Sequence, residues 1–252
     1  EFYQLYLYAF NNQDSEERRA FFNDRYEHSK VYGLLNGDKL SSGMLSIPFK
    51  VNFHGVTYKM IGIGDVMSYP EFGGHGAITA LMRQAFADMR SDDVALSYLA
   101  PFSYEFYRRF GYEEVFDRAV YKIKNTDLPR VKLSEERGQF LRLPLEDAIS
   151  LIDEVYENNA QSRNGGLKRE NWWWHYLGLK HPRWQVGVYL EDGQNASGYV
   201  IYEAAGNTFK IQEIMYTNQL SYQYLQRFIC QHESMFEEFE YASGDPKGFP
   251  DV

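Results

Sequence analysis

One succession of secondary-structure patterns occurs twice along the 252 residues. It consists of two helical patterns, an antiparallel meander of strands, a further helix and a further strand. In the first copy, apolar periodicity predicts helices at about residues 1–11 and 14–29, the second opened by the capping pattern DSEE. Strand patterns follow around the turns Asn36-Gly37 and His54-Gly55, and a helix at about residues 76–89 leads to the buried strand VALSYLA. A short helix, SYEFYRRF, and a strand, EEVFDRAVYKI, complete this copy.

A polar stretch, KNTDLPRVKLSEERG, separates the two copies and predicts domains at residues 1–131 and 132–252. The second copy reads as the strand QFLRL, two helices, three strands around short turns, the helix SYQYLQRFICQHESMF and the strand EFEYAS. The two halves share no obvious sequence identity. The repeated order therefore predicts a structural duplication, with helices packed on mixed sheets in an α/β (α+β) fold.

Composition excludes several classes of protein. A chain that is 44% hydrophobic and 17% aromatic can bury a substantial core. Its formal charge of −9 argues against binding nucleic acid or an anionic membrane surface, and suits a cationic substrate or simply a soluble protein. The single cysteine, Cys230, cannot form an intrachain disulfide, which fits a cytoplasmic location. No stretch has the length of a membrane span and no signal peptide opens the chain.

The junction between strand and helix differs between the copies. The first copy reads SYPEFGGHGAITALM at residues 68–82, whereas the corresponding junction of the second, IMYTNQLSYQYL, contains no glycine. A glycine-rich turn before a helix exposes backbone N–H groups, and the helix dipole favours an anion there. The alternative is a surface turn that needs positive φ. A P-loop would need Lys-Ser or Lys-Thr after Gly76, and a dinucleotide fingerprint would need a third glycine, so neither motif fits.

The order of elements and two motifs resemble the Gcn5-related N-acetyltransferase (GNAT) family. The family's pyrophosphate loop, Arg/Gln-x-x-Gly-x-Gly/Ala, falls on residues 73–78, where Gly76 matches, Gly73 replaces Arg or Gln and Ile78 replaces the small residue. The segment FYRRFGYEEV resembles the family's YxxxGF/Y segment, whose tyrosine falls on Tyr107. With a second, glycine-poor copy, the chain is similar to the enhanced-intracellular-survival (Eis-like) subfamily. That subfamily has tandem GNAT-like domains and a sterol-carrier-like third domain, which this chain does not include.

The resemblance implies two domains, each a mostly antiparallel central sheet flanked by helices, with acetyl-CoA bound as co-substrate by the first. The residues that it implies for acetyl-CoA are Val66, Met67, Gly73, Gly74, His75, Gly76, Ala77, Ile78, Ser103 and Phe106. Tyr107 would be the general acid that protonates the thiolate, since a phenol and a thiol have comparable pKa values.

The acceptor implied by the subfamily is an amine, for example on a polycationic molecule such as an aminoglycoside, and the protein would be a homo-oligomer. Asp24, Glu27 and Asp65 are candidates to line an amine cleft, and Asp65 is also one of several candidate bases. No metal is expected, because His175 and His181 lack suitably spaced ligand partners. The rival hypothesis is a non-catalytic acyl-CoA-binding or scaffold protein, since the loop departs from the family pattern at two positions.

Overall fold

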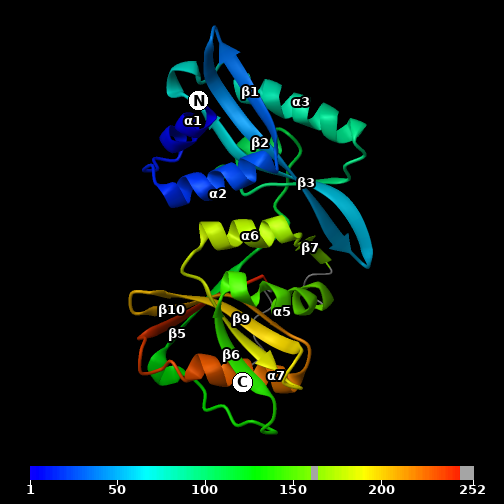
Figure 1. Ribbon diagram of the computed structural model, residues 1–252. Coiled ribbons are helices and arrows are strands. Elements are labelled where there is room, and N and C mark those ends of the chain that lie inside the picture. The colour runs from blue at the N-terminus through cyan, green and yellow to red at the C-terminus, as the bar shows by residue number, and fades with distance from the viewer. Residues whose placement is uncertain (160–163, 245–252) are drawn as a thin grey trace. The chain divides into compact units, whose positions relative to one another are not determined.

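The computed structural model describes residues 1–159 and 164–244. The chain forms two compact units (Figure 1). The first contains Glu1–Glu113 together with strand β7 (Asn164–Lys168), and the second contains the other described residues from Glu114 onward. The sequence placed the boundary later, after residue 131, because it assigned one more strand to the first copy. Within the described residues, none of the helices combines the length and apolar character that crossing a membrane requires.

As far as helix α4, the first unit has the element order that the sequence predicts. Its elements are α1 (Phe2–Ala9), α2 (Glu16–Glu27), β1 (Lys30–Asn36), β2 (Lys39–Phe53), β3 (Val56–Ser68), a 3₁₀ turn (Pro70–Phe72), α3 (Ala77–Ser91), β4 (Leu96–Tyr98) and α4 (Tyr104–Arg108). The predicted capping pattern is present, since the Ser15 hydroxyl accepts a hydrogen bond from the Arg18 N–H at 3.1 Å. Capping by serine satisfies an amide that would otherwise lack an intrahelical partner.

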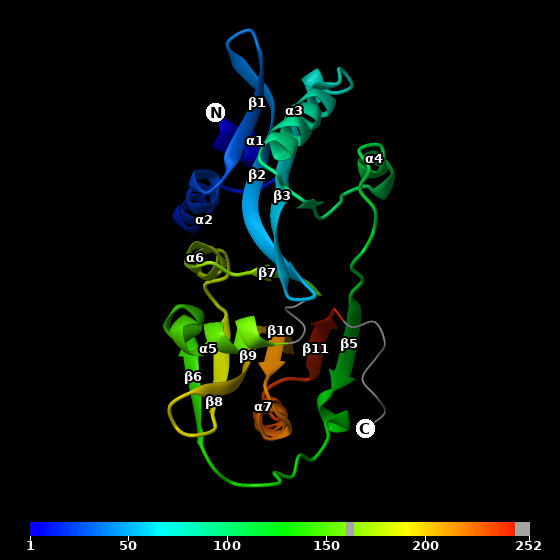
Figure 2. The same cartoon turned by 90° about the vertical axis from the view of Figure 1, so that its right-hand side faces the viewer.

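The sheet of the first unit has the order β1-β2-β3-β4, and β7 also pairs with β2. Pairing is antiparallel except between β3 and β4, which run parallel and pair only where Met60–Gly62 faces Leu96–Tyr98. β3 continues beyond this short pairing to Ser68. Helix α3 lies on one face of the sheet and α1 and α2 lie on the other (Figure 2). The predicted apolar stripe of α3, which includes Leu81, Met82 and Ala85, is buried against the sheet.

The second unit repeats this plan with a larger sheet. Its elements are β5 (Ala119–Lys124), a 3₁₀ turn (Asn125–Asp127), β6 (Gln139–Pro144), α5 (Leu145–Asn158), α6 (Asn171–Lys180), β8 (Gln185–Leu190), β9 (Ala196–Ala205), β10 (Thr208–Tyr216), α7 (Gln219–Cys230) and β11 (Glu238–Ser243). The strand order is β5-β11-β10-β9-β8-β6, with only β10 and β11 parallel among these pairs. Alternate residues of a strand point to opposite faces. Tyr199 and Ile201 of β9 accordingly join the cluster of α5, whereas Val200 and Tyr202 join that of α7.

Two strands depart from the sequence-based prediction. The pattern EEVFDRAVYKI was expected to end the first unit, but β5 within it pairs antiparallel with β11 in the second sheet. The segment NGGLK carries no strand pattern, yet it forms β7 and pairs with β2 over residues 50–53. β1 already pairs with residues 39–46 of the same strand, so β7 extends the pairing along the remaining part of β2. Both differences concern which strands meet, and this choice depends on residues that are distant in sequence.

Candidate functional site

The loop between β3 and α3 depends on two glycines in the left-handed conformation. Gly74 has φ +80 and Gly76 has φ +79, and a Cβ on either residue would meet nothing within 4 Å. Residues with a side chain rarely adopt this conformation, so the loop requires glycine at both positions although space surrounds them. Gly73 is different, because its φ of −66 is accessible to any residue. All three glycines are exposed.

Helix α3 begins directly behind this loop with an open N-terminus. Gly76 is the N-cap, and the Ala80 N–H makes the first hydrogen bond back to it, 3.0 Å from the Gly76 carbonyl oxygen. The amides of the first turn precede this bond, no side chain caps them, and no acidic residue lies in that turn. Such N–H groups, aligned with the helix dipole, form a site that favours an anion.

The corresponding helix of the second unit, α7, has a closed N-terminus. Asn218 caps it and accepts a hydrogen bond from the Ser221 N–H at 2.9 Å, while the Asn218 N–H donates to the Ser221 hydroxyl at 3.3 Å. This reciprocal capping box satisfies two backbone amides at the start of α7, those of Asn218 and Ser221. Of the two equivalent junctions, that of the first unit has no side-chain cap, whereas that of the second is capped by Asn218 and Ser221.

Strand β3 bulges shortly before the glycine loop. Met67 lies opposite Gly43 and Gly64 lies opposite Leu45, so β3 carries one more residue than β2 over this interval. Asp65, within the bulge, has φ +47, and its carboxylate lies 2.5 Å from the guanidinium of Arg25 on α2. Bulges redirect the strand and leave backbone groups outside the ladder, and they occur frequently beside active sites.

Tyr107 lies on the short helix α4. The Ser103 hydroxyl caps this helix by accepting a hydrogen bond from the Phe106 N–H at 3.2 Å. Tyr107 is buried, and its ring meets those of Phe106 and Tyr112 edge-on at centroid distances of 5.1 and 6.1 Å. Burial raises the pKa of the Tyr107 hydroxyl, so the phenol is protonated at neutral pH and can donate a proton.

The other predicted residues of the first unit take these places. Val66 packs against the apolar cluster under α3, to which Tyr112 also packs, and Met67 is buried. His75 is exposed on the loop. On α2, Glu27 is exposed and the Asp24 carboxylate lies 3.9 Å from the His28 ring. The carboxylate of Asp65 is bound to Arg25, which leaves it poorly placed for direct contact with an amine.

Sequence reasoning did not identify two residues that organise this region. Arg25 holds the bulge through Asp65, and no local pattern distinguished it from the other charges of α2. Tyr112 connects Tyr107 with the sheet, and its only sequence signal was its place in the quoted segment FYRRFGY.

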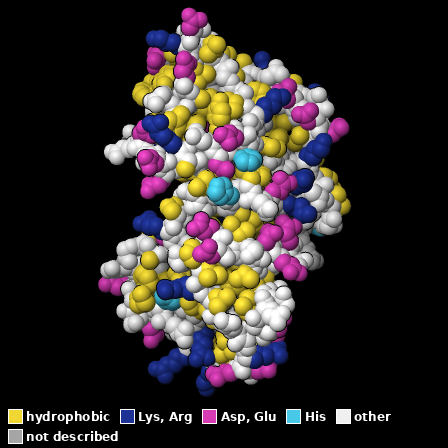
Figure 3. Space-filling model, viewed as in Figure 1, with side chains coloured by type: hydrophobic (Ala, Val, Ile, Leu, Met, Phe, Trp, Pro, Cys, Tyr) yellow, Lys and Arg dark blue, Asp and Glu magenta, His cyan; other side chains and the backbone are white. Residues whose placement is uncertain are grey.

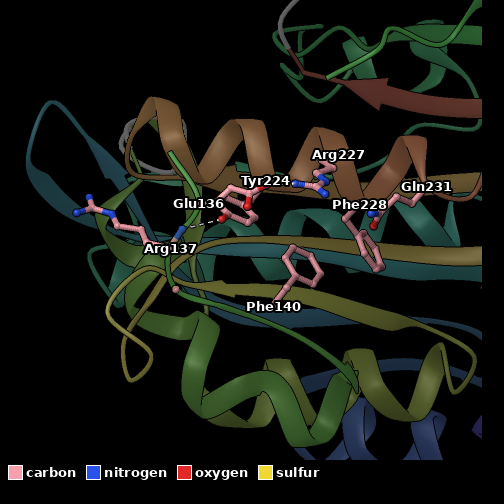
Figure 4. A pocket seen from close by; sticks show the side chains of 8 residues that line it. Glu136, Arg137, Phe140, Tyr224, Arg227, Phe228 and Gln231 are labelled. Atoms are coloured by element: carbon pink, nitrogen blue, oxygen red, sulfur yellow. Dashed lines mark hydrogen bonds and ion pairs between the residues drawn. The ribbon is translucent and has the colours of Figure 1, made fainter. Parts of the chain in front are cut away.

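A pocket of about 430 Å³ lies in the second unit, between the segment before β6 and helix α7 (Figure 4). The rings of Phe140 and Phe228 stack beside it at a centroid distance of 4.6 Å. The arginines that line it already bind carboxylates, Arg137 that of Glu191 and Arg227 that of Glu136. All residues that line this pocket belong to the second unit, whereas the glycine loop belongs to the first.

Comparisons with known proteins give the same family description for two parts of the chain. A family model described as "Acetyltransferase (GNAT) domain" matches residues 1–115, and a second model with the same description matches residues 165–249. A conserved protein of unknown function from Enterococcus faecalis V583, described as a probable N-acyltransferase, has 40% sequence identity and a TM-score of 0.94, over 99% of this chain and 64% of that chain. None of the curated proteins matches the chain in sequence.

More distant solved structures share the fold. A GCN5-related N-acetyltransferase from Anabaena variabilis ATCC 29413 has a TM-score of 0.81 and 20% identity, over 96% of this chain and 62% of that one. Eis1 from Mycobacterium abscessus has a TM-score of 0.75 and 17% identity, over 99% of this chain and 64% of that one. The chain thus spans slightly less than two thirds of the length of these relatives.

Proposed function

This chain belongs to the GNAT acetyltransferase family and contains two GNAT domains, and we propose that the first domain transfers the acetyl group of acetyl-CoA to an amine. The observation that carries the proposal is the open N-terminus of α3 behind Gly74 and Gly76. The pyrophosphate of coenzyme A binds the amides of Gly74, Gly76, Ala77 and Ile78, with His75 beside them. Backbone amides supply these contacts, so Gly73 in place of Arg or Gln removes one side-chain contact without removing the site.

The pantetheine arm lies along the end of β3, at Val66 and Met67. Beyond its short pairing with β4, this part of β3 has backbone groups available, and the bulge redirects them. The Met67 N–H polarises the thioester carbonyl and stabilises the oxyanion that forms when the amine attacks. Ser103 and Phe106 lie at the thioester end of the cofactor.

The reaction is direct attack of a neutral amine on the thioester carbon. The C–N bond forms, the C–S bond breaks, and the Tyr107 phenol gives its proton to the departing thiolate. The proton lost by the attacking nitrogen passes to solvent, from which the phenolate is reprotonated. The products are an amide and free coenzyme A, so no further reactant is needed.

The acceptor that we propose is an amine of a polycationic small molecule, of the aminoglycoside type. The support is the net charge of −9, which favours association with cations. Acidic and basic side chains are interspersed over the face drawn in Figure 3, so the acidic excess is not gathered there. The second domain, whose α7 N-terminus is capped, binds no coenzyme A in this way. By analogy with its relatives, we propose that the protein is a cytoplasmic homo-oligomer.

The experiment combines turnover with binding. Purified protein, acetyl-CoA and a panel of mono- and polyamines should release free thiol, and Gly76→Glu should abolish coenzyme A binding in calorimetry because a side chain and a negative charge enter the anion site. Gly193→Glu is the matched control, since Gly193 has φ +78 with open space around it but lies in a turn of the second unit. Unchanged coenzyme A affinity in Gly76→Glu would refute the location of the site.

A non-catalytic acyl-CoA-binding or scaffold protein is the alternative function. It predicts tight coenzyme A binding with no thiol release on any amine. Turnover of the parent protein separates the two; where thiol is released, Tyr107→Phe should lower kcat with little change in cofactor affinity, whereas a binding module should show no turnover and the same affinity in both proteins.

A further inference from the structure

We propose that Tyr112 is a positioning residue, which holds the Tyr107 phenol in place by tying it to the junction of β3 and β4. The inference rests on the proposed function of Tyr107 as the general acid. Tyr112 itself need not touch substrate or cofactor. It acts through its hydroxyl, its ring and its backbone N–H, each of which makes a separate contact.

The hydroxyl of Tyr112 is anchored to the sheet. Ser97 on β4 lies directly opposite Ile61 on β3, and its hydroxyl donates a hydrogen bond to the Ile61 carbonyl oxygen at 3.1 Å. That bond uses the single proton of the serine, so the Tyr112 hydroxyl must donate to the Ser97 oxygen, 2.5 Å away. Tyr112 is thereby fixed to both strands at the point beyond which β3 continues without β4.

From this anchor, Tyr112 reaches Tyr107 in two ways. Their rings meet edge-on, with centroids 6.1 Å apart and an interplanar angle of 76°. The Tyr107 carbonyl oxygen also accepts hydrogen bonds from the N–H groups of Phe110 and Tyr112, at 2.9 and 3.4 Å. Gly111 makes this return of the chain possible, since its φ is +87. The segment FYRRFGY therefore folds back on its own tyrosine.

The other ring contacts of Tyr107 come from its own short segment. Helix α4 has five residues, and the nearby rings of Phe102 and Phe106 belong to the same short segment as Tyr107. Phe102 is 74% exposed. Tyr112 and Ser97 instead connect Tyr107 with β3, the strand that carries the bulge at Asp65. A general acid must keep its distance to the leaving group, and a displacement of ~1 Å can cost on the order of 100-fold in rate.

The test removes one hydroxyl group. Tyr112→Phe keeps the ring and should lower kcat about tenfold, while the KM for acetyl-CoA stays within about twofold, since no contact with the cofactor is lost. Ser97→Ala should have the same effect, and the double variant should be no worse than either single one. Tyr32→Phe is the matched control, because its hydroxyl donates to Asp88 at 2.6 Å in the same unit. It should lower the melting temperature and leave kcat unchanged.

A second measurement does not depend on turnover. With 3-fluorotyrosine introduced at position 107, fluorine NMR should give one sharp resonance in the parent protein, and broadened or multiple resonances in Tyr112→Phe but not in Tyr32→Phe. An unchanged resonance together with unchanged kcat in Tyr112→Phe would overturn the inference. If the parent protein acetylates no amine, the proposed function fails instead, and the fluorine spectrum alone decides whether Tyr112 positions Tyr107.

Discussion

The guanidinium of Arg25 binds the carboxylate of Asp65 at 2.5 Å, and Asp65 is the left-handed residue at which β3 bulges. Both side chains are largely buried, with exposed fractions of 12% and 6%. The ion pair therefore connects α2 with the part of β3 that precedes the glycine loop. It stabilises a backbone conformation that Asp tolerates better than most residues do.

Two replacements of Asp65 should separate the contribution of its charge to stability from that of its backbone conformation. Asp65→Asn keeps the tolerance for positive φ but leaves the buried guanidinium without its carboxylate, and should lower the free energy of unfolding by about 3 kcal/mol. Asp65→Ala should cost ~1 kcal/mol more, because alanine is strained in the left-handed region. Urea denaturation, followed through the unfolding transition of the first domain, measures both changes in free energy. Equal stability of Asp65→Asn and the parent protein would show that the pair does not hold the bulge.

In the second domain, Arg169 should not tolerate replacement by lysine. Its guanidinium makes two hydrogen bonds to the Glu213 carboxylate, at 2.9 and 2.5 Å, and lies over the rings of Tyr156 and Trp174 at 4.0 and 4.4 Å. Lysine keeps the charge but loses the forked pairing and the planar stacking, so Arg169→Lys should cost about 2 kcal/mol of unfolding free energy. The control is Arg183→Lys, at a pair with Glu203 where the arginine is 78% exposed; this change should cost less than about 0.5 kcal/mol.

The capping box of α7 should contribute to stability and not to cofactor binding. Asn218→Ala removes the acceptor of the Ser221 N–H and should lower the unfolding free energy of the second domain by about 1 kcal/mol. The affinity for coenzyme A, measured by calorimetry, should stay unchanged, because the proposed site uses α3. A loss of affinity would mean that the second domain contributes to coenzyme A binding after all.

Stability should fall in mildly acidic solution because of His181. Burial, reinforced by the nearby Lys180 charge, lowers the pKa of this imidazole from 6.5 to about 4. The unfolded chain therefore binds more protons than the folded one between these values, and stability decreases as the pH falls through that window. The ring stacks on Trp184 at a centroid distance of 4.0 Å, so His181→Phe keeps the stacking without the titration. Urea midpoints from pH 7 to pH 4.5 should fall less steeply in this variant; parallel curves would contradict the assignment.

Much of the fold could be predicted from sequence because the signals are local. The two N-terminal helices, the turns at Asn36-Gly37 and His54-Gly55, the stripe of α3 and the meander of the second unit all lie where periodicity and turn residues placed them. The same holds for the glycine loop. The left-handed conformation of Gly74 and Gly76 could be expected, because glycine adopts it without strain.

The tertiary structure alone decided which distant segments meet. β5 pairs with β11 and β7 pairs with β2. Neither pairing follows from the local sequence, because strand pairing depends on the packing of the whole sheet. For the same reason, the sequence did not predict that Arg25 pairs with Asp65 or that Ser97 binds the Tyr112 hydroxyl. The sequence determined most of the elements and the two left-handed glycines of the loop before α3. The assembled sheets decided how the bulge is held and how Tyr107 is surrounded, since those contacts exist only once the chain has folded.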